Sequence, residues 1–408
     1  RTMYPPVSDE FWKFVRDNAR ADVSKLRLKY HGAESPAIDY EAAITQIECR
    51  QRFGSKLADT LGSAPEFFFA NTLAGEQSTS YALAAFHASL MESDGLSVTD
   101  LTCGLGIDVF HLARRASQVT GIDRQEHLAE APGHNARQLG LGNVRGLCGD
   151  SVSMLTDGKL HADMAFIDPA RRGEDGKRLF AVADCQPDVV ALMPELRKCF
   201  RFLVVKLSPM LDVTQCLREL GKNVTDIYAL GTRTECKELV AALDFSNETD
   251  CPGIHAVTVG NDGKWDDFSF TIPEEEAAAP PRTIAPKAGW AVYEPFPAVM
   301  KAAPLKLLAS RFQGLAKLAS NTHVYTSEVP IAAFPGTAWK VDEVVEWKSK
   351  NIKRLKSRLP QADVAVRNFG MSAAELQSKL GIRQGGNARL LGVTDSRGER
   401  LMLVLRPE

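Results

Sequence analysis

The sequence has no cysteine or histidine pattern of the kind that marks a metal or redox site. Its eight cysteines are scattered over 408 residues without a Cys-x-x-Cys pair, and none of its eight histidines has a metal-ligand partner at helical spacing. Neither a zinc site nor a redox dithiol is indicated, so we expect no bound metal. Reduced, mostly buried thiols in a cytoplasmic protein are the simpler interpretation.

Long hydrophobic runs are also missing. No stretch approaches the roughly 18 uninterrupted apolar residues that a membrane-spanning helix needs, and residues 1–6 hold no apolar segment of a secretory signal. The composition, 44% hydrophobic and 25% charged, is ordinary for a soluble globular protein. We therefore expect a cytoplasmic protein of about two to four domains.

A large net charge is lacking too, because the formal charge is only −2. Taken alone, this value argues against a nucleic-acid partner, but the charge is unevenly distributed. Residues 301–408 hold nine Lys and nine Arg against nine Asp and Glu together, so they carry +9 and the preceding residues carry −11. The densest basic run, residues 348–358, could be a nucleic-acid-binding surface or only a solvated helix face.

The order of expected elements divides the chain into parts. Apolar residues recur at helical spacing through residues 8–92, strands and helices alternate from about 93 to 272, and a charged Ala/Pro-rich stretch follows at 274–281. The alternation predicts a doubly wound, mostly parallel α/β sheet, and the remainder predicts two small α+β units. The expected domains are a helical one at 1–92, an α/β one at 93–272, a linker with a small domain at 273–334, and a basic one at 335–408.

Several segments allow more precise predictions. Residues 224–230 and 239–243 could pair as antiparallel strands, although 235–240 could equally begin a helix, and Asn261-Asp262-Gly263 indicates a further hairpin. Pro132 should kink or end the helix in which it falls. Residues 299–318 are expected to form one helix. Residues 73–80 could place polar groups over a ligand or simply cap the helix that follows.

The most informative segment is residues 97–108, with the sequence SVTDLTCGLGID. It predicts a strand, a tight turn and a helix, and Gly104 and Gly106 let the backbone turn sharply and approach a ligand closely. A dinucleotide-binding turn requires a third small residue where this chain has Val109. The segment is therefore a nucleotide-binding corner that does not favour NAD.

Carboxylates on both sides of this turn narrow the choice of ligand. Asp100 precedes the turn and Asp108 follows it, so a pyrophosphate would be repelled and a cationic ligand favoured. The pattern resembles motif I of class I S-adenosylmethionine-dependent methyltransferases, whose cofactor carries a sulfonium and an amino group. Later strands ending in acids agree with that family's order, which implies that Asp123 binds the ribose and Asp150 the adenine. The expected cofactor-binding residues are Asp100, Thr102, Cys103, Gly104, Leu105, Gly106, Asp108, Asp123, Asp150, Ser151 and Asp168.

The methyl acceptor would meet the segment Asp168-Pro169-Ala170-Arg171-Arg172. Related enzymes that methylate exocyclic or ring nitrogens carry Asp/Asn-Pro-Pro-aromatic or Pro-Pro-Arg there, which implies that Asp168 accepts a hydrogen bond from the target nitrogen. This chain departs from that pattern at Ala170 and Arg171. Arg171 could stack on a base, pair with a phosphate or lie on an ordinary surface loop. The candidate catalytic residues are Asp168, Pro169 and Arg171.

The basic tail has a resemblance of its own. Residues 365–376, Gly385-Gly386 and the final hairpin look like the THUMP-like domain at the C-terminus of a bacterial methyltransferase family, and residues 293–327 resemble that family's ferredoxin-like segment. True THUMP domains bind structured RNA, usually tRNA, so the resemblance implies an RNA partner. The expected RNA-binding residues are Arg172, Lys206, Lys350, Lys353, Arg354, Lys356 and Arg367. Lys206 could instead be a core lysine whose ammonium reaches the surface.

These patterns together predict transfer of a methyl group from S-adenosylmethionine to a base nitrogen in RNA, with guanosine in tRNA as the first candidate. No cysteine follows Pro169, so the covalent route of pyrimidine C5 methylation is disfavoured. The alternatives are a nicotinamide or flavin oxidoreductase on the same fold, a non-catalytic RNA-binding protein with a relict methyltransferase fold, and a methyltransferase acting on a protein or small molecule.

Overall fold

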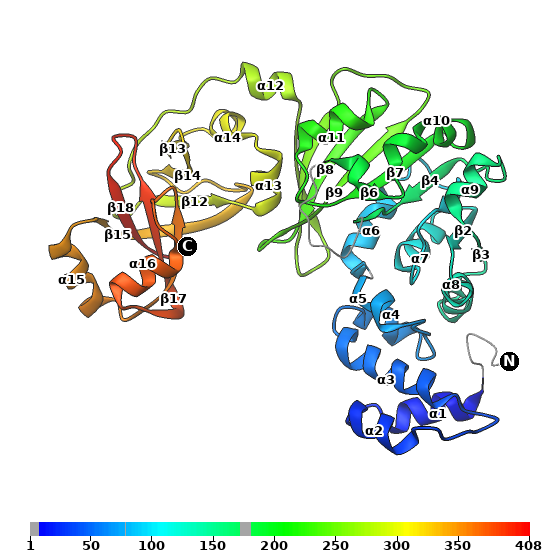
Figure 1. Cartoon of the computed structure of the whole chain (residues 1–408). Coiled ribbons are helices and arrows are strands. Elements are labelled where there is room, and N and C mark those ends of the chain that lie inside the picture. Colours follow the sequence, from blue (N-terminus) through cyan, green and yellow to red (C-terminus); the bar gives the residue numbers. More distant parts are fainter. Residues whose placement is uncertain (1–7, 78, 172–180) are drawn as a thin grey trace. The chain divides into compact units, whose positions relative to one another are not determined.

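The N-terminal part of the chain is helical, as its apolar spacing predicts (Figure 1). The structure is a computed structural model that describes residues 8–77, 79–171 and 181–408. Side chains of Ser8, Asp22 and Asp39 cap the first three helices by accepting hydrogen bonds from their first turns. The helices are α1 (Asp9–Asp17), α2 (Val23–Tyr30), α3 (Tyr40–Phe53), α4 (Ala58–Ser63), α5 (Thr72–Gln77) and α6 (Tyr81–Ser89).

By its internal contacts the chain divides into two units. One comprises residues 1–227 and 239–250, and the other comprises residues 228–238 and 251–408. In the part of the chain that the structure describes, no helix has the length and apolarity to cross a membrane.

A nine-stranded sheet forms the centre of the α/β region, in the order β11-β10-β8-β9-β7-β4-β1-β2-β3. The strands β3, β2, β1, β4 and β7 pair in parallel, and β9 pairs with β7 antiparallel. The carboxyl ends of the parallel strands therefore meet at one edge. Strand bounds are β1 (Ser97–Asp100), β2 (Gln118–Asp123), β3 (Val144–Cys148), β4 (Met164–Ile167), β7 (Phe202–Leu207), β8 (Val224–Gly231), β9 (Cys236–Asp244), β10 (Gly253–Val259) and β11 (Trp265–Phe270).

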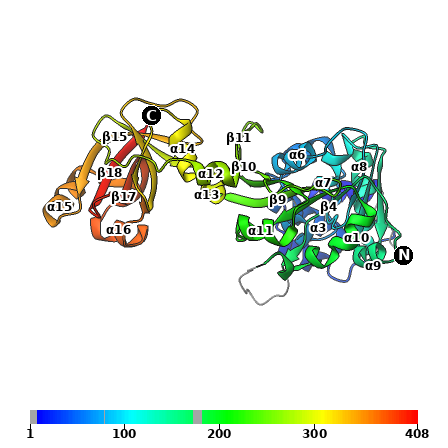
Figure 2. The same ribbon diagram turned by 90° about the horizontal axis from the view of Figure 1, so that it is seen from above.

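Helices cover both faces of the parallel strands (Figure 2). The helices α6, α7 and α8 lie on one face, and α9, α10 and α11 lie on the other. This arrangement confirms the predicted doubly wound α/β fold. The bounds of these helices are α7 (Ile107–Ala113), α8 (Glu126–Gln138), α9 (Ser151–Thr156), α10 (Val189–Cys199) and α11 (Val213–Leu220). After β4, the short strand β5 (Ala170–Arg171) pairs antiparallel with β6 (Cys185–Gln186), and the 3-10 helix Val182–Asp184 directly precedes β6.

The ambiguous segments of the α/β region are resolved by strand pairing. Residues 236–240 belong to strand β9 and not to a helix, and β9 pairs with β7 from Leu239 to Asp244. Asn261-Asp262-Gly263 turns the predicted hairpin between β10 and β11. Of the two alternatives for Pro132, a kink or an early end of its helix, the early end is wrong, since α8 continues to Gln138 with Pro132 inside it. Pro132 is buried, and its ring lies against the turn at Gly106.

The C-terminal part forms one seven-stranded sheet, in the order β13-β14-β12-β15-β18-β17-β16. The predicted pair of small α+β units is thus joined into a continuous sheet, because β12 pairs antiparallel with both β14 and β15. The strands are β12 (Ala291–Pro295), β13 (Ala316–Ala319), β14 (Thr322–Ser327), β15 (Gly336–Glu346), β16 (Gln361–Arg367), β17 (Arg383–Thr394) and β18 (Arg400–Pro407).

The single helix expected over residues 299–318 is wrong. The chain forms α13 (Pro297–Ala302), α14 (Leu305–Arg311) and strand β13 there. Pro304 separates the two helices because its ring prevents helical hydrogen bonding, and Ala303 before it adopts a left-handed conformation with φ of 61°. The stretch 274–281, expected to be a linker, begins within helix α12 (Ile272–Ala277).

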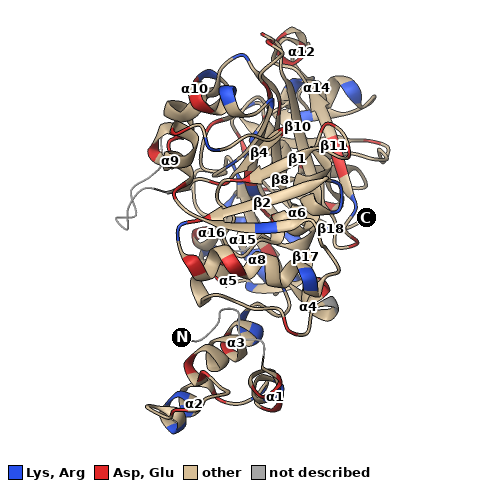
Figure 3. Ribbon diagram, turned by 90° about the vertical axis from the view of Figure 1, so that its right-hand side faces the viewer, with Lys and Arg blue, Asp and Glu red and all other residues tan. Residues whose placement is uncertain are grey.

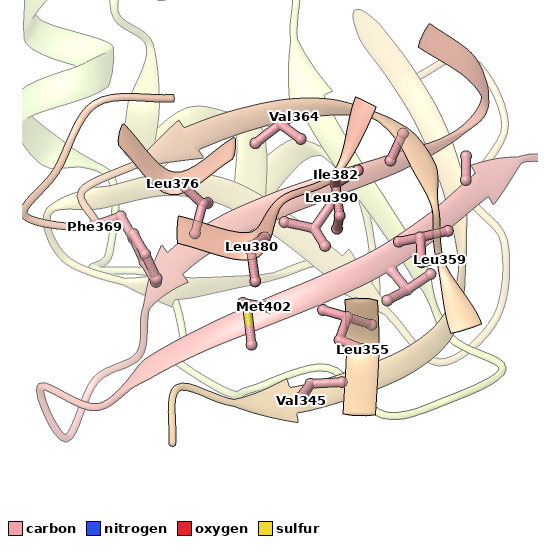
Figure 4. Packing of buried hydrophobic residues seen from close by; sticks show 13 residues of the cluster. Val345, Leu355, Leu359, Val364, Phe369, Leu376, Leu380, Ile382, Leu390 and Met402 are labelled. Carbon is pink, nitrogen blue, oxygen red and sulfur yellow. The ribbon is translucent and has the colours of Figure 1, made fainter. Parts of the chain in front are cut away.

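Two helices, α15 (Ser349–Arg358) and α16 (Ala373–Leu380), lie side by side against the strands at one end of this sheet (Figure 2). Their apolar side chains, including Leu355, Leu376 and Leu380, pack on Leu390 and Met402 of the sheet (Figure 4). Since Leu355 is fully buried, α15 is anchored by its apolar side and leaves its basic residues exposed.

Candidate active site at the carboxyl ends of the strands

The glycine turn after β1 is built as the sequence predicts. Gly104 and Gly106 have φ values of 53° and 89°, a region in which residues with a Cβ are strained. A Cβ on Gly106 would come within 3.2 Å of Pro132, whereas one on Gly104 would meet no protein atom within 4 Å. The Cys103 N–H donates to the Ile122 carbonyl of β2 at 3.1 Å and fixes the turn. Gly104 therefore leaves backbone open to a ligand.

Two carboxylates flank this turn with opposite electrostatic character. Asp100 is only 1% exposed, and burial, reinforced by the charges of Asp108 and Asp168, raises its pKa to about 8. Burial would also raise the pKa of Asp108, but the charge and hydrogen bond of His87, with help from Lys206 and Thr79, lower it. The first turn of α7 thus carries a buried negative charge at Asp108, which opposes phosphate binding there.

The next two strands end in the acids expected to bind the ribose and adenine. Asp123 is half-buried, and its Oδ1 accepts a hydrogen bond from the Gln125 N–H at 3.0 Å. Asp150 caps α9, whose first residue is Ser151: its Oδ1 accepts from the Val152 N–H at 2.9 Å, and its Oδ2 lies 2.8 Å from Arg124. Asp150 is therefore held by the protein on both oxygens, whereas Asp123 is oriented through one of them.

The glycine turn and these carboxylates fit S-adenosylmethionine better than a dinucleotide. Gly104 and Gly106 permit close approach, Asp123 offers an acceptor for ribose hydroxyls, and the negative charge of Asp108 beside the turn suits a cationic ligand. Thr102 and Leu105 complete the turn in which Cys103 is buried. When bound, the cofactor supplies an electrophilic methyl group. In the described residues, no three His, Cys, Asp or Glu side chains are grouped to hold a metal ion.

The expected acceptor residues lie where β4 ends. The Asp168 N–H donates to Thr102 Oγ1 at 2.7 Å, so the end of β4 is joined to the glycine turn. Ala170 and Arg171 continue as strand β5, paired with β6. Pro169 is buried between Asp168 and this strand. Arg172 lies outside the described residues.

Lys206 lies beside Asp168 at this site. Its ammonium lies 3.1 Å from Asp168 Oδ2 and donates to Thr79 Oγ1 at 3.4 Å, and its side chain is 16% exposed. Sequence reasoning did not identify the contacts that Thr79 and His87 make in this arrangement. The only signal for Thr79 was the polar stretch 73–80, which does place a side chain at the site.

The basic residues predicted on the tail divide into two groups. Four exposed cations of α15 form no salt bridge with any described residue: Lys350, Lys353, Arg354 and Lys356. Arg367 instead pairs with Glu294 at 3.2 Å, so it is engaged within the fold. Charges of both signs mix on helices of the first unit, such as α10, where Lys198 pairs with Glu195 at 3.1 Å (Figure 3).

Replacing Asp123 with Ala should weaken cofactor binding by about 1.5–3 kcal/mol, because the ribose hydroxyls would lose a charged acceptor. Calorimetric titration with S-adenosylhomocysteine measures this as a rise of roughly 10- to 100-fold in Kd. Asp157→Ala, an exposed acid that pairs with Lys159, is the matched control and should bind normally. An unchanged Kd for the Asp123 variant would show that the carboxylate at the end of β2 does not bind the ribose.

The raised pKa of Asp100 predicts that the free energy of unfolding depends on pH. Its folded pKa of about 8 exceeds the unfolded value of about 3.9, so between these values the folded chain retains a proton that the unfolded chain has released. The stability of the wild type should therefore fall as pH rises through this window. Asp100→Asn, which mimics the protonated acid, should gain about 1–3 kcal/mol over the wild type between pH 4 and pH 8. Urea unfolding at both pH values tests this, and a pH-independent difference would contradict it.

Comparison with known proteins agrees with this geometry. Residues 92–235 match a methyltransferase domain, 292–335 a ferredoxin-like domain and 336–407 a THUMP domain-like family. An uncharacterized RNA methyltransferase from Gloeobacter violaceus is 37% identical over 151 residues, and a 23S rRNA (uracil(747)-C(5))-methyltransferase from Vibrio vulnificus is 38% identical over 74. These matches cover 37% and 18% of this chain, and only 31% and 20% of the two relatives.

A solved structure matches the whole chain. The crystal structure of a protein described as a methyltransferase from Porphyromonas gingivalis W83 superposes with a TM-score of 0.86 and is 31% identical, covering 98% of this chain and 99% of that one. The predicted fold, cofactor and enzyme class are thereby confirmed. The chain belongs to the family of S-adenosylmethionine-dependent methyltransferases that carry C-terminal ferredoxin-like and THUMP-like domains.

Proposed function

We propose that this methyltransferase acts on RNA and methylates a nitrogen of a base, with guanosine in tRNA as the first candidate. The observation that carries the proposal is the position of Asp168, whose backbone is joined to the glycine turn and whose carboxylate lies against Lys206 at the acceptor edge. When the target nitrogen attacks the methyl group, an N–C bond forms, the C–S bond breaks, and a nitrogen-bound proton must leave. On this proposal, the Asp168 carboxylate receives it.

The cysteines near the site support a nitrogen acceptor. Covalent methylation of uracil C5, the reaction named for some relatives, requires a thiolate nucleophile. Cys103 in the glycine turn is buried, and burial, followed by the charge of Asp100, raises its pKa well above the usual value. Cys185 on β6 is buried as well. Neither thiol is available as a nucleophile, whereas Asp168 can serve a nitrogen.

An RNA substrate is supported by the exposed cations of α15 and by the relatives named as RNA methyltransferases. On this proposal, a cytoplasmic enzyme transfers the methyl group with its domain at 93–272 and binds RNA with its basic domain at 335–408. Residues 273–334 connect the two, and the helices at 1–92 complete the site through Thr79.

The direct test incubates the full chain with methyl-labelled S-adenosylmethionine and total RNA from a strain that lacks the gene, followed by nucleoside analysis. Label in an N-methylated nucleoside, recovered mainly from tRNA, supports the proposal. Label in 5-methyluridine would overturn the nitrogen acceptor, and label only in protein or small molecules would overturn RNA as the substrate. Binding of S-adenosylhomocysteine without any transfer would favour a non-catalytic RNA-binding protein.

A further inference from the structure

A chain of hydrogen bonds runs from the acceptor edge to the buried helix α6. Lys206 Nζ lies 3.1 Å from Asp168 Oδ2 and 3.4 Å from Thr79 Oγ1. The Thr79 hydroxyl donates to Asp108 Oδ2 at 2.9 Å, and Asp108 Oδ1 lies 2.7 Å from His87 Nδ1. Residues of α6 and α7, the segment before α6, and the ends of β4 and β7 thus form one continuous network.

The direction of each hydrogen bond in this network is fixed by chemistry. An ionised carboxylate only accepts, so both His87 Nδ1 and the Thr79 hydroxyl donate to Asp108. Having donated its single proton, Thr79 can only accept from the Lys206 ammonium. His87 is fully buried and Thr79 is 8% exposed, so water does not compete freely for these contacts. The orientation of Thr79 is therefore set by the buried Asp108–His87 pair.

The position of Lys206 depends on what holds its ammonium. Strands β4 and β7 pair in parallel with Ile167 beside Val205, so Asp168 and Lys206 follow on neighbouring strand ends. A lysine side chain has four flexible bonds, and fixing it in one conformation costs rotamer entropy. Thr79 supplies a second anchor besides Asp168. With both contacts made, the ammonium holds one oxygen of the carboxylate in place.

We propose that Thr79 is a positioning residue for methyl transfer: held by Asp108 and His87, it fixes the Lys206 ammonium, which in turn orients the Asp168 carboxylate toward the acceptor. The inference rests on the proposed function in one respect, namely that Asp168 takes the proton of the target nitrogen. Electrons of the C–S bond stay on sulfur, the nitrogen lone pair forms the new N–C bond, and the nitrogen-bound proton passes to Asp168. Lys206 keeps its own proton throughout.

The variants Thr79→Val and Thr79→Ser separate positioning from packing, because valine keeps the volume and serine keeps the hydroxyl. Thr79→Val should lower kcat for labelled transfer to RNA by about 10-fold, with KM for RNA and the Kd for S-adenosylhomocysteine nearly unchanged. Thr79→Ser should recover most of the rate. Thr79→Ala serves as a second variant if valine impairs folding, which is checked by thermal unfolding.

The pH dependence of kcat gives a readout that a packing defect would not change. Releasing the ammonium from Asp168 should move the acid limb of the profile to higher pH in Thr79→Val. The other charged groups facing this cluster are Asp100 from β1, Asp108 from α7 and His87 from α6, and Thr79→Ser leaves all of them as they are. An unshifted profile in Thr79→Val would contradict the inference.

A double-mutant cycle identifies the path of the effect. In Lys206→Met, adding Thr79→Val should cause little further loss of kcat, because the lysine through which Thr79 acts is already gone. An equal, multiplicative loss in both backgrounds would overturn the inference. NMR of protein labelled with ¹³Cε-lysine adds a measurement independent of activity: Thr79→Val should increase the mobility of the Lys206 signal, assigned by its loss in Lys206→Met. If the wild type methylates no RNA, the proposed function fails, while this NMR result still decides whether Thr79 holds Lys206.

Discussion

Replacing Asp168 with Ala should reduce the turnover number by about 100-fold or more while leaving RNA binding nearly intact. The carboxylate lies against Lys206, and its removal takes away the group that we propose receives the proton of the target nitrogen. Cofactor binding should persist because the glycine turn and Asp123 keep their own hydrogen bonds to the main chain.

Single-turnover transfer of labelled methyl groups to RNA measures this effect, with calorimetric binding of S-adenosylhomocysteine as the check on folding. Asp168→Asn is an informative companion, since its amide oxygen still accepts a hydrogen bond but cannot take up a proton at neutral pH. If the turnover number of Asp168→Asn is as low as that of Asp168→Ala, proton transfer is the essential role of this carboxylate. Turnover of Asp168→Ala near the wild-type value would exclude Asp168 from the chemistry.

Much of the α/β region could be predicted because its signals are local. The strand, glycine turn and helix of residues 97–113 follow from consecutive residues, and each acid that ends a strand lies directly beside that strand in sequence. The hairpin at 261–263 and the helix Ala373–Leu380, capped by Ser372, likewise depend on neighbouring residues alone. Such patterns survive in the folded chain because tertiary contacts reinforce them.

The parts that sequence reasoning missed depend on contacts between distant residues. Thr79 and Lys206 are 127 positions apart, and nothing near either residue distinguishes their hydrogen bond from solvent exposure. A lysine at the end of an apolar strand fits a phosphate contact, a surface-reaching core lysine and an ion pair equally well. The continuous seven-stranded sheet was missed for the same reason, since β12 meets β15 only after some 40 intervening residues have folded.

Replacing Lys350, Lys353, Arg354 and Lys356 with Gln should weaken RNA binding strongly and flatten its salt dependence. Each lost phosphate contact lowers the log–log slope by roughly 0.7–0.9, so the slope should fall by about 3 if all four residues contact RNA. The fold should be maintained because α15 is anchored by the buried Leu355 on its other side (Figure 4). Affinity for S-adenosylhomocysteine should not change, since the site residues lie in another part of the chain.

Filter binding to tRNA at two or more salt concentrations measures both the affinity and the slope. The matched control replaces four exposed cations of the N-terminal helical region, Arg16, Arg20, Lys25 and Lys29, with Gln, so that the net charge changes equally. If α15 is the RNA surface, only the tail variant loses affinity and slope. Equal losses in both variants would show that RNA affinity depends on the overall charge of the protein and not on α15. Undiminished binding of the tail variant would show that α15 is a solvated helix face, because removing true phosphate contacts must reduce the number of counterions released on binding.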